Sequence, residues 1–106
     1  MLESKFQREL RKDLKDLFKG CMIFKMDSAS HGAGIPDLLV LYKNTWFALE
    51  VKQSATAKRQ PNQPWYVETL DHMSFAAFIH PGNREEILHE LCEAFGVGRA
   101  TLDSKR

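Results

Sequence analysis

Several features that would narrow the class of this protein are missing from its 106 residues. No apolar run approaches the roughly 20 residues that a membrane-spanning helix needs, and residues 1–5 lack the apolar core of a signal peptide. The two cysteines, Cys21 and Cys92, have neither metal-ligand nor redox spacing. We therefore expect reduced thiols and an intracellular protein, in the cytoplasm of a bacterium or of a virus-infected host cell.

The chain also lacks an excess of charge of either sign. Its 15 Lys and Arg residues nearly balance 14 Asp and Glu residues, and the net charge of +1 gives no evidence for nucleic-acid binding. Repeats and low-complexity segments are absent as well. The composition, with 43% hydrophobic residues, favours one folded domain over residues 1–98, followed by a flexible tail over 99–106.

Hydrophobic periodicity and turn residues predict the order of secondary-structure elements. An apolar stripe at helical spacing predicts a first helix that ends at Gly20. Asn62 and Asn83 are expected to cap the later helices. The expected elements are a helix over 2–19, strands over 21–26, 37–42 and 45–52, a helix from 62, a strand over 74–79 and a helix after 83. This αβββαβα order predicts an α/β fold around a mixed sheet.

The most informative feature is a short hairpin that carries acidic residues. Lys43-Asn44 is the shortest loop that joins the second and third strands, and it would place Asp37 directly opposite Glu50. Because side chains alternate along a strand, Lys52 shares the face of Glu50. Two carboxylates this close repel each other unless a cation lies between them. The pattern therefore suggests a site for a hard divalent metal ion.

Three segments in this order resemble a known superfamily. Gly34-Ile35-Pro36-Asp37, Glu50-Val51-Lys52 and Asn62-Gln63-Pro64-Trp65 are similar to motifs of the PD-(D/E)xK nucleases, and most like the VRR-Nuc group of small viral and bacterial enzymes. The resemblance implies a restriction-endonuclease-like αβββαβ core, with a mixed central sheet flanked by helices. It also implies a Mg²⁺-dependent DNA endonuclease that hydrolyses phosphodiester bonds, with Mn²⁺ as a substitute. The expected substrate is branched DNA such as a four-way (Holliday) junction.

The same resemblance implies roles for individual residues. Asp37 and Glu50 would bind the metal together with the backbone carbonyl of Val51, since oxygen ligands suit Mg²⁺. Lys52 would position or activate the attacking water. Gln63 would lie near the metal at the start of the second helix, and Gln60 competes for that role.

The first helix offers a further acidic candidate. On a helical wheel Glu3 lies close to the centre of the apolar stripe, where a carboxylate needs a partner. The family often places a glutamate on this helix, so an active-site role is expected. Alternatively, Glu3 only favours the positive end of the helix dipole. Glu9 points away from the stripe and is the weaker candidate.

Contacts to DNA are expected on both sides of the acidic pair. Ser30 and His31 lie in the loop before Asp37, and Lys58 and Arg59 lie in the polar stretch after the hairpin. A homodimer is expected, because a small chain leaves apolar faces that a second copy can cover. Two alternatives stay open: a site-specific or nicking endonuclease of the homing or restriction type, and a non-catalytic nucleic-acid-binding module.

Overall fold

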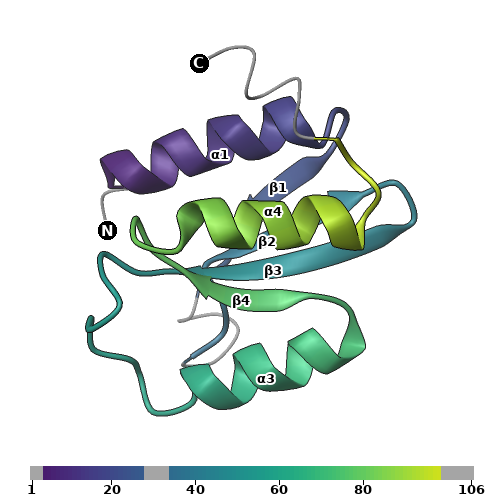
Figure 1. Ribbon diagram of the computed structural model, residues 1–106. Helices are drawn as coiled ribbons and strands as arrows, with labels where there is room; N and C mark the ends of the chain where they lie inside the picture. The colour runs from purple at the N-terminus through teal and green to yellow at the C-terminus, as the bar shows by residue number, and fades with distance from the viewer. Residues whose placement is uncertain (1–3, 28–33, 99–106) are drawn as a thin grey trace.

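The computed structural model describes residues 4–27 and 34–98, and within them helices and strands follow the expected order (Figure 1). The elements are α1 (Lys5–Leu17), β1 (Met22–Lys25), β2 (Leu38–Tyr42), β3 (Thr45–Val51), α3 (Gln63–Met73), β4 (Ala76–Ile79) and α4 (Arg84–Ala94). None of these helices is long and apolar enough to cross a membrane.

The four strands form one mixed sheet in the order β1-β2-β3-β4. β1 with β2 and β2 with β3 are antiparallel, whereas β3 and β4 are parallel. The parallel pair requires a crossover, which α3 provides. Helices α1 and α4 cover one face of the sheet, and α3 lies on the other (Figure 1). The predicted α/β class and the mixed sheet flanked by helices are confirmed.

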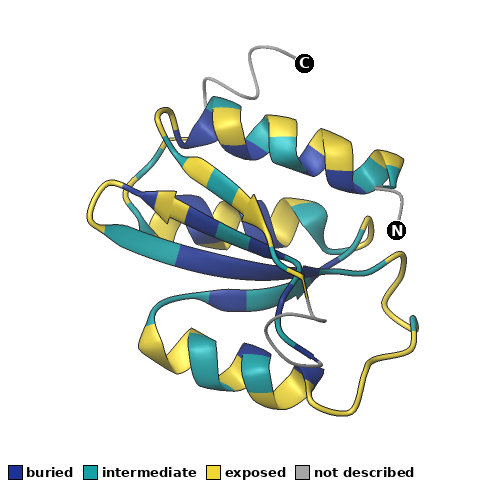
Figure 2. Cartoon of the chain, turned by 180° about the vertical axis from the view of Figure 1, so that it is seen from behind, coloured by how far each residue is buried: buried dark blue, intermediate teal, exposed yellow. Residues whose placement is uncertain are grey.

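The main core lies between the sheet and the pair α1 and α4. An ion pair between Asp13 and Arg84 also links these two helices. The fully buried side chains of this core include Leu10, Leu14, Phe18, Leu38, Val40, Phe47, Leu49, Ile79, Leu88 and Leu91. A smaller cluster joins Val67 of α3 to Ala48 and Ala76 of the sheet. Since α3 covers β3 and β4, no helix of the described residues covers the same face of β1 and β2 (Figure 2).

The helix ends differ in part from the prediction. Ser4 caps α1, because its hydroxyl accepts a 3.0 Å hydrogen bond from the N–H of Gln7. Gly20 follows α1 with a φ of +87°, a conformation that favours glycine. The expected side-chain caps at Asn62 and Asn83 are wrong. Asn83 instead uses its amide to accept from the N–H of His80 and to donate to the carbonyl of Phe78.

Candidate active site

The candidate site lies where β2 begins and β3 ends. Leu38 pairs with Leu49, and the two-residue turn at Lys43-Asn44 fixes this register. The next pair outward is Asp37 and Glu50, and the N–H of Asp37 donates a 3.2 Å hydrogen bond to Glu50 Oε1. The predicted face-to-face placement of the two acids is therefore confirmed.

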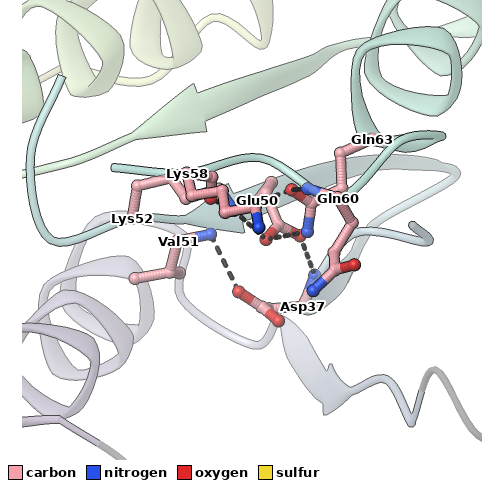
Figure 3. Close-up of polar contacts among 7 residues, drawn as sticks. All are labelled: Asp37, Glu50, Val51, Lys52, Lys58, Gln60 and Gln63. Carbon is pink, nitrogen blue, oxygen red and sulfur yellow. Dashed lines mark hydrogen bonds and ion pairs between the residues drawn. The ribbon is translucent and has the colours of Figure 1, made fainter. Parts of the chain in front are cut away.

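Lys52 brings a positive charge to the same place (Figure 3). Its ammonium nitrogen lies 3.5 Å from Glu50 Oε2. It also donates to Gln63 Oε1 at 2.7 Å and to the carbonyl of Lys58 at 3.1 Å. Since these contacts hold the ammonium beside the acids, the flexible lysine side chain is already oriented towards the site.

Gln63, the first residue of α3, connects this helix to the site. Its Nε2 donates a 2.8 Å hydrogen bond to Glu50 Oε2, and its Oε1 accepts from Lys52 and from the backbone N–H of Gln60. Both ends of the amide are thus used, and the side chain is buried. Of the two glutamines considered, Gln63 reaches Glu50 with its side chain, whereas Gln60 joins the network through its backbone (Figure 3).

The electrostatics of the acidic pair favour a cation. Burial raises the pKa of Glu50 to about 7, and the negative charge of Asp37 adds to this rise, while Lys52 opposes it. Burial likewise raises the pKa of Asp37, although the N–H of Val51 donates a 3.0 Å hydrogen bond to its Oδ2. With Glu50 only 3% exposed, water solvates this charge poorly. A bound cation would relieve both penalties.

The donor set of the site suits Mg²⁺. In residues 4–27 and 34–98 no cluster of three or more His, Cys, Asp or Glu side chains is found. Mg²⁺ does not require one, because it usually keeps several waters and binds through one or two carboxylates together with substrate phosphates. Asp37 and Glu50 supply two such carboxylates, and the Val51 carbonyl lies between Glu50 and Lys52 in the chain. The residues present therefore fit this ion.

The other predicted site residues have mixed outcomes. Glu9 is exposed and lies 4.0 Å from Lys5, its partner one helical turn away, so it does not join the acidic pair. The guanidinium of Arg59 stacks at 3.8 Å on the ring of Phe78. Lys58 contacts Lys52 through its backbone carbonyl, and its own side chain is exposed. Glu3, Ser30 and His31 lie outside the described residues.

A cleft of about 770 Å³ adjoins the site and contains a residue that the sequence analysis missed. Asp37, Val51 and Lys52 form one wall, and the first turn of α1 with Gln7 forms another. Gln7 is buried, with 7% of its surface exposed. The available signal was its position, three residues before Leu10 and seven before Leu14 on the apolar stripe, where a polar residue is unexpected.

Comparison with known proteins bears on the fold. No family model matches the chain, and no curated protein matches it. A solved structure described as "VRR_NUC domain protein" is similar, with a TM-score of 0.52 and 18% sequence identity, over 84% of this chain and 89% of that one. The chain therefore has the restriction-endonuclease-like fold that a VRR-Nuc domain protein also adopts.

Proposed function

We propose that this protein is a Mg²⁺-dependent DNA endonuclease of the VRR-Nuc group. The observation that carries the proposal is the pair of half-buried Asp37 and buried Glu50, opposed across one hairpin, with the Lys52 ammonium 3.5 Å from Glu50. A protein that only binds nucleic acid gains nothing from two acids beside a phosphate. The fold shared with a VRR-Nuc domain protein supports the same function. Such an enzyme would act inside a cell, where DNA is found.

Each site residue has a task in the proposed hydrolysis. Asp37, Glu50 and the Val51 carbonyl would hold Mg²⁺, which lowers the pKa of water and neutralises charge on the phosphate. Lys52 would hold the attacking water by a hydrogen bond and stabilise charge on the phosphate oxygens. Water adds to phosphorus and the bond to the 3′ oxygen breaks, leaving a 5′-phosphate and a 3′-hydroxyl. Gln63 would keep Glu50 and Lys52 in place.

We further propose that the enzyme acts as a homodimer on branched DNA. On the uncovered face of the sheet, Met22 is 57%, Phe24 is 43% and Leu41 is 38% exposed. Met22 pairs with Leu41 across β1 and β2, so these side chains form one apolar surface. A second copy would cover it, and two identical sites suit a four-way junction of approximate two-fold symmetry. Leu41→Glu should then convert a dimer to a monomer in sedimentation equilibrium, whereas an unchanged mass would contradict this assignment.

The decisive experiment compares DNA structures and metals. Purified protein is incubated with labelled four-way junction, flap, single-stranded and linear duplex DNA, in Mg²⁺, in Mn²⁺ and in EDTA. We expect cutting near the branch in either metal, little cutting of linear duplex and none in EDTA. Asp37→Ala should abolish cutting and leave DNA binding largely intact, whereas Glu68→Ala, which changes an exposed acid on α3, should cut like the wild type.

Three results would contradict the proposal. Cutting at an unchanged rate in EDTA would exclude the metal mechanism. Binding without cutting in both metals would favour a non-catalytic binding module. Cutting of linear duplex at one sequence, with no preference for branches, would instead favour a site-specific or nicking endonuclease.

A further inference from the structure

The cleft beside Asp37 continues past the acidic pair to the first turn of α1. Ser4, Lys5 and Gln7 line it from the helix, and Lys25 lines it from the end of β1. Asp37, Val51 and Lys52 line the opposite wall, whereas Glu50 and Gln63 are not among the lining residues. The cleft therefore extends beyond the acidic pair. Its second wall, formed by polar residues at the start of α1 and by Lys25, has no assigned role.

Gln7 has an unmet hydrogen-bonding requirement at this second wall. Its side-chain Nε2 is buried and makes no hydrogen bond within the part of the chain that the structure describes. Buried polar groups in folded proteins are nearly always hydrogen-bonded, so each exception needs an explanation. An apolar residue at this position would pack without that cost, as Leu10 and Leu14 do on the same stripe. The Gln7 side chain lines the cleft, although Nε2 itself has almost no exposed surface, so a turn of the amide towards the cleft would let a ligand with an oxygen acceptor satisfy it.

Three lysines, Lys5, Lys25 and Lys52, line the cleft together with two acids, Asp27 and Asp37, and the lysines favour an anion as that ligand. Lys5 and Lys25 line the cleft near the positive end of the dipole of α1, a helix of 13 residues. The first amide N–H groups of a helix have no acceptor within the helix. The hydroxyl of Ser4 accepts a hydrogen bond from one of them, the backbone N–H of Gln7. Lys25 also lies near Asp37. Burial raises the pKa of Asp37, and the positive charges of Lys52 and Lys25 oppose that rise.

We propose that Gln7, Lys25 and the first turn of α1 bind a second phosphate of the DNA backbone, next to the phosphate that is cut at Asp37 and Glu50. This inference rests on the proposed function and deepens it. Phosphate contacts fix the register of a protein on nucleic acid without reading its sequence. The second phosphate would therefore set which bond of the strand reaches Lys52 and the acidic pair.

The test neutralises one phosphate at a time. Labelled junction DNAs carry a single methylphosphonate at successive positions around the cut, and their dissociation constants are measured by fluorescence anisotropy in EDTA. For the wild type, one position adjacent to the cut phosphate should weaken binding about tenfold, the usual effect of losing a charge-assisted hydrogen bond. Gln7→Leu should weaken binding of unmodified DNA by a similar factor. A methylphosphonate at that position should then weaken the binding of the variant little further.

Two more variants and a stability measurement complete the test. Gln7→Leu should unfold at the same or a higher temperature than the wild type, which a merely structural role for the amide would not predict. Lys25→Met, which changes an exposed residue, should lose the same methylphosphonate effect. Lys12→Met, which removes an exposed lysine of α1 outside the cleft, should keep it.

The proposal is wrong if Gln7→Leu and Lys25→Met both keep the full methylphosphonate effect of the wild type. It is also wrong if no single position adjacent to the cut shows an effect in the wild type. Because these readouts are binding constants in EDTA, they do not depend on catalysis. A wild type that shows the binding pattern and never cuts DNA would contradict the proposed nuclease and leave the phosphate site intact.

Discussion

Gln63 donates a 2.8 Å hydrogen bond to Glu50 and accepts a 2.7 Å hydrogen bond from Lys52 with the other end of its amide. One side chain thus holds the carboxylate of Glu50 and the ammonium of Lys52 together. Gln63→Leu should lower kcat about 10²-fold, since it leaves Glu50 and Lys52 without this partner. The measurement is single-turnover cutting of junction DNA.

A conservative variant separates positioning from packing at this residue. Gln63→Glu keeps the acceptor for Lys52 and replaces the donor that faces Glu50 with a further acid. We expect it to cut more slowly than Gln63→Leu at neutral pH and to need a higher Mg²⁺ concentration for half-maximal rate. An equal metal requirement in both variants would show that Gln63 acts only through packing.

Lys52 should be required for cutting and dispensable for the fold. Lys52→Met keeps the length of the side chain and removes the ammonium, so we expect kcat to fall by about 10²- to 10⁴-fold. The control is Lys19→Met, which changes an exposed lysine far along the chain from the site. Circular dichroism and thermal unfolding should be close to those of the wild type. Lys52→Met that cuts at the wild-type rate would remove Lys52 from the mechanism.

The raised pKa of Glu50 predicts how stability depends on pH. Glu50 titrates near 7 in the folded protein and at an ordinary value of 4.5 when exposed, so the folded state binds more protons between these values. In EDTA the free energy of unfolding should therefore fall as the pH rises from about 4.5 to 7, by about 1–3 kcal/mol, and then level off. Urea unfolding at a series of pH values measures this, and Glu50→Ala should flatten the slope.

Mg²⁺ should reverse part of this loss. The ion binds the ionised carboxylates of Asp37 and Glu50, so its stabilising effect should be larger at pH 8 than at pH 5. The measurement is the shift of the urea midpoint on adding Mg²⁺ at each pH. An equal shift at both pH values would mean that the ion binds elsewhere.

Gly34 offers a test of how the loop before Asp37 supports α3. Its φ is +96°, and a Cβ there would come within 2.8 Å of Asn62 Cβ and 3.0 Å of the Gln63 nitrogen. Gly34→Ala should therefore cost more than the roughly 1–2 kcal/mol expected for a left-handed alanine, and should also slow cutting by displacing Gln63. Gly20→Ala is the matched control, since φ is +87° but nothing lies within 4 Å.

The hairpin was the most predictable part of the structure, because a two-residue loop leaves little freedom in register. Asp37 and Glu50 therefore meet as the sequence indicated. The contacts of Gln63 with both Glu50 and Lys52 were harder to predict from the sequence, since they depend on where α3 begins relative to the sheet. Asn83 does stand at the start of α4, but its side chain makes no capping hydrogen bond, because its amide binds the chain just before the helix, a competing use of the same side chain.

Gln7 was missed for a related reason. Glutamine is a good helix former, so periodicity treats it as an ordinary surface residue. Its position on the apolar stripe indicated burial, but the cleft beside it follows from the packing of α1 against the sheet, which no local pattern encodes. The family resemblance directed attention to Glu3 and Glu9, and Glu9 turned out to be exposed.

The hydrogen bond from Lys52 to the carbonyl of Lys58 closes the intervening chain into a small ring. Residues 53–56 of this ring are exposed, and lengthening such a loop costs only about 0.6 kcal/mol for each doubling. The junction of Ala55 and Thr56 is therefore a permissive insertion point. A fluorophore or short peptide tag placed there would sit beside the candidate catalytic lysine and report the arrival of a nucleic acid without touching the residues that would process it.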